Sequence, residues 1–242
     1  MTPRSCFVLI ALLALFATPA RTAERPVVVE LFTSQGCYSC PPAEALLTEL
    51  VVQRRDVLAL EFHVDYWDSL VYGGSSWKDP FSDPAFTQRQ RHYAQTILGR
   101  PSIYTPQMVF DGRREAVGSR RSDVLDVIRR LQRDRASEPK LVVTRDGDDL
   151  QVSLDGVPAQ PAALWFVTFL RQHRTDVKGG ENRGKVLVNT HVVRSLRSLA
   201  SWSGGPLDVR TEATLESGHD CAVLLQANDQ GPILAAARCP AT

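Results

Sequence analysis

The sequence predicts a mixed α/β domain followed by a small antiparallel β-domain. Two observations lead to this. A strand, a Cys-x-x-Cys pair at Cys37 and Cys40, a helix and a second strand follow one another near the N-terminus. Beyond Glu138-Pro139, helical periodicity gives way to short alternating strands separated by turn residues. We therefore expect one domain over residues 24–138 and a β-rich domain over residues 139–242.

Residues 1–23 are predicted to be a signal peptide. Arg4 gives a basic start, Phe7–Phe16 is a short apolar run, and small residues lead to Ala23. The apolar run is too short to span a bilayer comfortably, although a retained N-terminal anchor is the alternative. The mature protein is expected to be periplasmic or secreted and free of the membrane. Its formal net charge of +1 gives no reason to expect a nucleic-acid partner.

The first domain begins with a strand, a helix and a strand. Residues Val27–Thr33 form a β-branched apolar run typical of a strand buried on both faces. Pro41 and Pro42 stand where a helix can begin, and the helix is expected to continue over Ala43–Val52. A second strand, Val57–Val64, follows and should run parallel to the first with a right-handed crossover.

The rest of this domain is predicted to contain a loop, two helices and two strands. Residues 65–82, rich in Trp, Tyr, Gly and Asp, indicate an irregular loop. A helix over Pro84–Leu98, strands over Gln107–Phe110 and Arg114–Val117, and a helix over Ser122–Leu131 are then expected.

The second domain is predicted to be a small antiparallel sandwich. Its expected strands are Leu141–Thr144, Leu150–Leu154, Leu164–Leu170, Lys185–Arg194, Ala222–Ala227 and Ile233–Ala237. The last two should form a hairpin about Gln230, which lies equally far from Cys221 and Cys239. These two cysteines then face each other within disulfide reach, and closing so short a loop should stabilise the fold by about 3 kcal/mol. We expect a structural disulfide.

The dithiol is the predicted functional site. A helix N-terminus presents unpaired N–H groups, which favour a thiolate at Cys37, and Cys40 can then resolve a mixed disulfide. Two alternatives remain open. The pair can be half of a zinc site completed by Cys221 and Cys239, or an inert surface disulfide.

Two further residues are expected beside the dithiol. Pro106 precedes the third main strand, and only X–Pro bonds adopt the cis form at modest cost. Thr105 would then offer backbone groups to an extended substrate. The alternative is an ordinary trans proline at the start of an edge strand.

Polar residues in and after the first two strands complete the predicted site. Glu30 interrupts a buried strand and is predicted to relay protons to Cys40, unless it faces solvent at a strand end. His63, Asp65 and Trp67 alternate at the carboxyl end of the second strand, where ligand-binding groups gather. Asp65 and Trp67 are expected to contact substrate. His63 is expected to be a hydrogen-bonded residue in the wall of the site or, alternatively, a metal ligand together with the two thiols.

Taken together, these motifs resemble a known family. The segments that carry the resemblance are Glu30–Cys37 with Cys40-Pro41-Pro42, His63–Asp68, Trp77–Pro80, Arg89–Arg91, Tyr104–Met108, Gly180–Asn182 and His191–Arg194. They are similar to an uncharacterised bacterial family of exported thioredoxin-like proteins, domain of unknown function 1223. In the family the Tyr-Trp-Asp segment runs almost directly into Gly-Trp-Lys-Asp, whereas here residues 71–76 intervene.

The resemblance implies an α/β thioredoxin-like domain followed by a small, sandwich-like antiparallel β-domain. By similarity to the wider thioredoxin superfamily, Cys37 is the attacking thiol, Cys40 the resolving thiol and Pro106 the cis-proline. The expected function is thiol–disulfide exchange with protein or small-molecule thiols and disulfides, without a bound cofactor. Alternatives are a Cu(I)-handling protein that uses Cys37, Cys40 and His63, and a non-catalytic binding scaffold.

Overall fold

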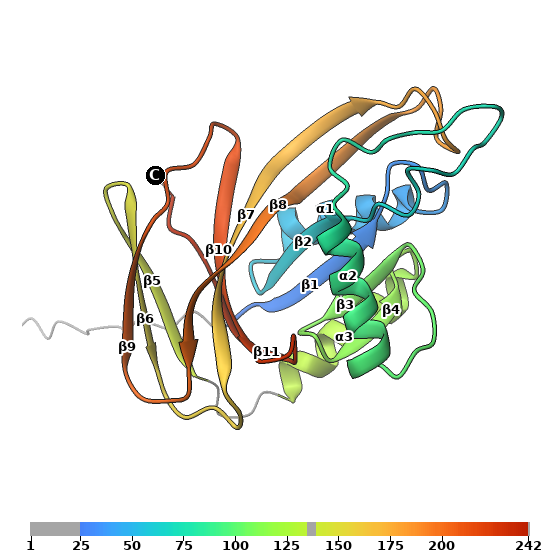
Figure 1. Cartoon of the computed structure of the whole chain (residues 1–242). Helices are drawn as coiled ribbons and strands as arrows, with labels where there is room; N and C mark the ends of the chain where they lie inside the picture. The colour runs from blue at the N-terminus through green and yellow to red at the C-terminus, as the bar shows by residue number, and fades with distance from the viewer. Residues whose placement is uncertain (1–24, 135–138, 242) are drawn as a thin grey trace, which may run out of the picture.

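A computed structural model describes residues 25–134 and 139–241 of the chain. These residues form two β-sheets and three α-helices (Figure 1). The helices are α1 (Pro41–Gln53), α2 (Pro84–His92) and α3 (Arg121–Arg133). The strands are β1 (Val27–Thr33), β2 (Val57–His63), β3 (Gln107–Phe110), β4 (Arg114–Val117), β5 (Lys140–Asp146), β6 (Asp149–Asp155), β7 (Ala162–Asp176), β8 (Val186–Trp202), β9 (Leu207–Glu212), β10 (His219–Ala227) and β11 (Ile233–Arg238).

The larger sheet has eight strands in the order β11-β10-β7-β8-β2-β1-β3-β4. At its centre β1 and β2 run parallel, and every residue of both strands is buried. The continuous apolar run that predicted β1 has this origin, because side chains on both faces are covered. Strand β8 joins β2 through a parallel pairing of Glu61 with Val192. Strands from both sides of the predicted boundary at residues 138 and 139 thus lie in one sheet, and the division into domains stays a prediction.

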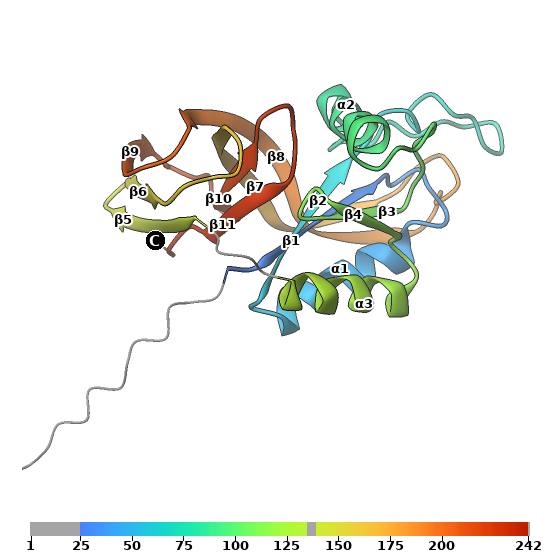
Figure 2. The same cartoon turned by 90° about the horizontal axis from the view of Figure 1, so that it is seen from below.

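Helices cover both faces of the parallel strands. Helices α1 and α3 lie on one face and α2 on the other (Figure 2). Val29 and Leu31 point to the first face and share a core with Leu47 of α1. Phe32 points to the second face and shares a core with Phe86 of α2. The alternation along β1 therefore decides which helix each side chain meets.

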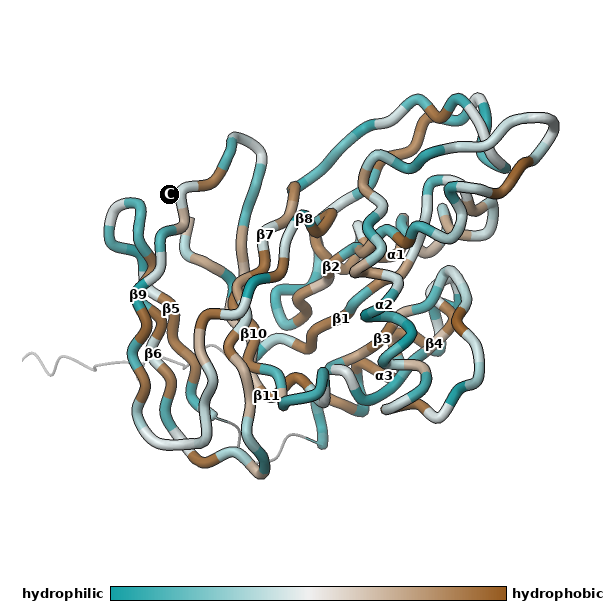
Figure 3. Tube along the Cα trace, in the orientation of Figure 1, coloured by the Kyte–Doolittle hydropathy of each residue, from teal (hydrophilic) through white to brown (hydrophobic). Residues whose placement is uncertain are grey.

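The smaller sheet has the order β5-β6-β9 and packs against β7, β10 and β11. Buried residues such as Val152 of β6, Leu164 of β7 and Val223 of β10 form their common core. Along β5 and β6, inward and outward side chains alternate, which Figure 3 shows as alternating hydrophobic and hydrophilic segments. This is the sandwich that the sequence predicted, and the α/β thioredoxin-like fold class is confirmed.

Strands β7 and β8 are longer than predicted. Their paired outer parts, residues 171–190, extend beyond the sandwich and form what we call the β7–β8 arm. Much of the arm is exposed, and Arg171, Gln172 and His173 are polar. The predicted strand Leu164–Leu170 ended where the apolar residues end, whereas the predicted strand Lys185–Arg194 already included the β8 part of the arm and missed residues 195–202. The arm is nevertheless ordered by ladder hydrogen bonds along its length.

Two smaller differences concern the end of one helix and one missed strand. The helix predicted over Pro84–Leu98 is α-helical only to His92 and continues as a π-helix over Tyr93–Ile97. Strand β9 was not predicted, since Leu-Asp-Val-Arg-Thr-Glu is short and half charged. No helix in the described part of the chain is long and apolar enough to cross a membrane.

Candidate functional site at the dithiol

Cys37 and Cys40 lie between the end of β1 and the start of α1 and form a disulfide with a Cα–Cα distance of 5.5 Å. Helix α1 begins at Pro41, as the two prolines predicted. Both cysteines are fully buried, whereas the side chain of Tyr38 between them is 65 % exposed. The loop that joins the sulfurs is therefore at the surface, and the sulfurs lie just beneath it.

A chain of hydrogen bonds reaches the sulfur of Cys37. The peptide bond between Thr105 and Pro106 is cis. The Thr105 hydroxyl donates to Cys37 Sγ at 3.4 Å, and the Trp67 indole N–H donates to Thr105 Oγ1 at 2.8 Å. The structure thus brings together four of the predicted site residues, Cys37, Cys40, Thr105 and Trp67, with Pro106 next in the chain.

The tip of the β7–β8 arm holds the dithiol loop from the other side. Asn182 is buried, and its Nδ2 donates to the carbonyl oxygens of Gln35 (3.0 Å) and Cys37 (2.8 Å). Glu181 Oε2 accepts a hydrogen bond from the Tyr38 N–H at 2.8 Å. A Cβ on Gly179 would lie 2.0 Å from a backbone oxygen of the loop over residues 65–82, so only glycine fits this close approach.

Sequence reasoning had given Glu181 and Asn182 no role in the site. They lie about 140 residues from the cysteines in the chain, and their proximity depends on the β7–β8 arm. The available signal was the Gly-Gly-Glu-Asn run itself, since paired glycines before polar residues indicate a tight turn that presents side chains.

Behind the loop lies a buried network of four ionisable side chains, Glu44, Glu61, His63 and Asp79, each 3 % exposed or less. His63 Nδ1 lies 2.7 Å from Asp79 Oδ2, and His63 Nε2 lies 3.2 Å from Glu61 Oε1. Asp79 Oδ2 also accepts the N–H of Gln35 at 2.7 Å. This bond links the network to the loop that carries the dithiol.

Glu44 lies one helical turn after Cys40, and its N–H donates to the Cys40 carbonyl at 3.2 Å. Its carboxyl accepts the Thr33 hydroxyl at 2.7 Å. Burial raises the pKa of Glu44 to about 8, and the nearby Glu61 carboxylate adds to this, against the opposite influence of His63. At neutral pH the Glu44 carboxyl therefore carries a proton.

His63 and Asp79 form an ion pair inside the protein. Burial alone would lower the pKa of His63, but the Asp79 and Glu61 carboxylates raise it well above the usual value. Burial would likewise raise the pKa of Asp79, yet His63 holds it below the usual value. The imidazole is thus a cation fixed between two carboxylates.

Glu30 is buried, but away from the dithiol network. It shares its face of β1 with Phe32, opposite α1, and its carboxylate binds Arg89 Nε at 2.8 Å and the Tyr93 hydroxyl at 2.6 Å. The structure thus rules out a solvent-facing Glu30 and gives its carboxylate an ion-pair partner. The proton-relay role of Glu30 stays a prediction, and Glu44 is the carboxyl that sequence reasoning overlooked.

Two other predicted site residues have partners away from the sulfurs. The Asp65 carboxylate accepts the Thr87 hydroxyl at 2.5 Å, which ties the loop after β2 to α2. Both ring nitrogens of His63 face carboxylates. Within residues 25–134 and 139–241, no three His, Cys, Asp or Glu side chains are arranged to hold a metal ion.

Comparison with known proteins identifies the family. The model of a family described as "Protein of unknown function (DUF1223)" matches residues 28–226. The chain belongs to the DUF1223 family. No curated protein matches the chain significantly.

Two solved structures resemble this DUF1223 protein. Protein AGR_C_4864 from Agrobacterium tumefaciens is 31 % identical, with a TM-score of 0.75 over 88 % of this chain and 93 % of that one. HBP35 of Porphyromonas gingivalis is 17 % identical, with a TM-score of 0.57 over 88 % of this chain and 74 % of that one, and shares the fold.

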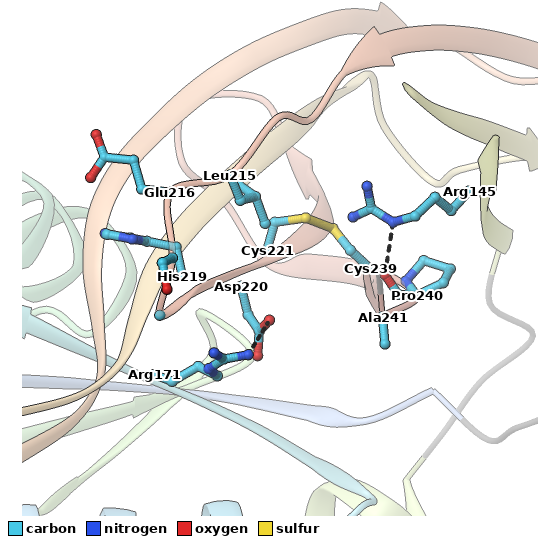
Figure 4. Close-up of a pocket in the computed structure, with 12 residues that line it drawn as sticks. Arg145, Arg171, Leu215, Glu216, His219, Asp220, Cys221, Cys239, Pro240 and Ala241 are labelled. Carbon is cyan, nitrogen blue, oxygen red and sulfur yellow. Dashed lines mark hydrogen bonds and ion pairs between the residues drawn. A yellow bond between two sulfur atoms is a disulfide. The ribbon is translucent and has the colours of Figure 1, made fainter. Parts of the chain in front are cut away.

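The DUF1223 chain has a second disulfide, between Cys221 and Cys239, which lines a separate cavity of about 230 Å³ (Figure 4). Arg145 Nε donates to the Pro240 carbonyl at 3.1 Å at the edge of this cavity. The four cysteines in the described part of the chain form two separate pairs. The zinc alternative required all four to meet at one site, and they do not.

Proposed function

We propose that this DUF1223 protein is an exported thiol–disulfide oxidoreductase that works through Cys37 and Cys40. The observation that carries the proposal is the disulfide at the junction of β1 and α1, beneath an exposed loop, with the Thr105 hydroxyl on Cys37 Sγ. A disulfide with a purely structural role needs no hydroxyl donor at its sulfur, whereas such a donor stabilises a thiolate.

The reaction has two steps. In the reduced protein, the Cys37 thiolate attacks a sulfur of the substrate disulfide, forms a mixed disulfide and releases the first substrate thiol. The Cys40 thiolate then attacks Cys37 Sγ, closes the Cys37–Cys40 disulfide and releases the second thiol. Because Cys37 is buried in the oxidised form, the exposed two-residue loop over Tyr38 and Ser39 must move for a substrate to reach it.

Proton transfer at Cys40 has a candidate partner in Glu44. Cys40 must lose its proton to attack. Glu44 lies one turn further along the same helix with a pKa of about 8, so the minor ionised fraction of its carboxyl at neutral pH is the form that can accept this proton. This value is close to that of a free thiol, so exchange of a proton between the two groups costs little free energy.

Two disulfides in one chain favour an oxidising compartment, in agreement with a periplasmic or secreted protein. The proposed partners are protein or small-molecule thiols and disulfides.

The test is exchange with a chromogenic aromatic disulfide by the reduced chain. Cys37→Ser should lower the exchange rate by at least about a thousandfold, as removal of a nucleophile does. Cys40→Ser should instead trap the mixed disulfide on Cys37, visible as an added mass. The matched control is Cys221→Ser with Cys239→Ser, which should exchange at the wild-type rate. Wild-type rates in Cys37→Ser would overturn the proposal.

A further inference from the structure

The start of α1 offers a thiolate fewer N–H donors than a helix N-terminus usually does. The Cys40 N–H already donates to the Cys37 carbonyl at 3.3 Å. Pro41 and Pro42, the first two residues of the helix, have no N–H at all. The sequence-based expectation that free helix N–H groups favour the Cys37 thiolate is therefore met only weakly here.

The remaining donor closest to Cys37 in the chain is bound to a carboxylate. The Tyr38 N–H donates to Glu181 Oε2 at 2.8 Å. Glu181 thus occupies a donor and places a negative charge one residue from Cys37. A nearby negative charge disfavours formation of a second one.

The other charged groups around the dithiol do not reverse this effect. Lys185 lies 4.2 Å over the Tyr38 ring, but it is exposed, so solvent screens its charge more than that of the half-buried Glu181. In the buried network His63 contributes one positive charge against two negative charges, from Asp79 and Glu61, because the Glu44 carboxyl is protonated at neutral pH.

Two neutral hydroxyls also contact the sulfur. Ser39 Oγ and Thr105 Oγ1 each lie 3.4 Å from Cys37 Sγ. Neutral donors at this distance form weaker hydrogen bonds than charged partners do. The balance of charges and donors around Cys37 is therefore unfavourable to a thiolate.

We infer that Glu181, a positioning residue of the β7–β8 arm, and the proline start of α1 together make the dithiol a reductant, so that this protein gives electrons to substrate disulfides. The inference rests on the proposed function and adds the direction of electron transfer. A protein whose reduced form is stabilised is a strong oxidant, and here the reduced form lacks that stabilisation.

The reaction balances as an exchange of two electrons and two protons. Reduced Cys37 and Cys40 and one substrate disulfide become the Cys37–Cys40 disulfide and two substrate thiols. The protein must then be reduced again by another dithiol, which leaves as a disulfide. A class of dithiol donor outside this chain is therefore required.

The experiment is redox equilibration of the full chain with glutathione at pH 7, with the reduced fraction of Cys37 read by alkylation and mass spectrometry. The wild-type equilibrium should favour the Cys37–Cys40 disulfide and oxidation of the protein by glutathione disulfide. Glu181→Gln should lower that equilibrium constant about tenfold, or about 30 mV. The thiolate absorbance of Cys37 should then rise at a lower pH.

Two further variants serve as a second test of the inference and as its control. Pro42→Ala restores an N–H at an exposed position of α1 and should shift the equilibrium in the same direction as Glu181→Gln without altering the arm. Glu216→Gln removes an exposed carboxylate in the loop before β10 and should leave the constant unchanged.

Two results would overturn the inference. One is a wild-type equilibrium in which glutathione keeps the dithiol reduced, which would identify an oxidant. The other is a shift in Glu181→Gln and Pro42→Ala no larger than that in Glu216→Gln. Either result leaves the proposed function standing if Cys37→Ser abolishes exchange, so the two failures are distinguishable.

Discussion

The two disulfides of this protein have nearly the same span, 5.5 and 5.3 Å between Cα atoms, but different surroundings. Cys37 and Cys40 are three residues apart in a loop held by polar groups from several segments. Cys221 and Cys239 are 18 residues apart, on β10 and just after β11, and line the apolar core of the sandwich. The comparison teaches that the surroundings, rather than the bond, distinguish the pair that we propose to be reactive from the pair that we expect to be structural.

The largest effect is expected from a substitution that breaks the charge network behind the Cys37–Cys40 pair. Asp79→Asn leaves the buried His63 without its closest carboxylate, so the free energy of unfolding should fall by about 3–5 kcal/mol. The matched change beside the second pair is Asp220→Asn, whose partner Arg171 is 3.7 Å away and largely exposed. It should cost less than about 1 kcal/mol in urea unfolding. Equal losses would show that the two surroundings do not differ in the way described.

A somewhat smaller effect on stability is expected when the disulfides themselves are removed, and it should differ between the two. In the chain-entropy model, loss of the Cys221–Cys239 bond should lower the free energy of unfolding by about 3 kcal/mol, and loss of the Cys37–Cys40 bond by about 2 kcal/mol. Urea unfolding of the double Cys→Ser variant of each pair checks this order. A greater loss from the Cys37 and Cys40 variant would give the first bond the structural role.

The pH dependence of stability is expected to come from the first site as well. The pKa of Glu44 is raised from 4.5 to about 8 by burial, so between these values the unfolded chain loses a proton that the folded protein keeps. The unfolded state is then favoured as pH rises, and stability should fall by up to about 1.4 kcal/mol per pH unit between pH 5 and 8. Glu44→Gln should flatten this slope, measured by urea unfolding at each pH. An unchanged slope would contradict the assignment.

The smallest expected effect tests the hydrogen bonds on Cys37. Trp67→Phe removes the donor to Thr105 Oγ1 and frees the Thr105 hydroxyl to turn away from the sulfur. The exchange rate should fall about three- to tenfold, since one neutral hydrogen bond contributes about 1 kcal/mol. The rate with a chromogenic disulfide checks it, and a thousandfold loss would instead give Trp67 a direct role.

Sequence patterns predicted the secondary structure around the dithiol and missed the contacts between residues that lie far apart in the chain. The strand before Cys37 and the helix after Cys40 followed from apolar runs and proline positions, which depend on neighbours in the chain. The partners of the dithiol loop at Glu181 and Asn182 did not, because the β7–β8 arm brings them there through sheet pairing with β2.

The prediction of a buried carboxyl beside the dithiol had the same limit. Glu30 was selected because it interrupts an apolar strand, and the strand does bury it. Its face of the sheet, however, was decided by alternation and by the packing of α2. Glu44 lies in a helix where a glutamate is ordinary, so nothing in the pattern distinguished it from a surface residue.

Limited reduction of the intact protein tests the central claim most directly. After brief treatment with a low concentration of dithiol, alkylation and mass spectrometry report which of the two disulfides has opened. Exposure alone would favour the second pair, since Cys239 is partly exposed and both Cys37 and Cys40 are fully buried. We predict that Cys37–Cys40 opens at least a hundredfold faster. Equal rates, or earlier opening of Cys221–Cys239, would contradict the account.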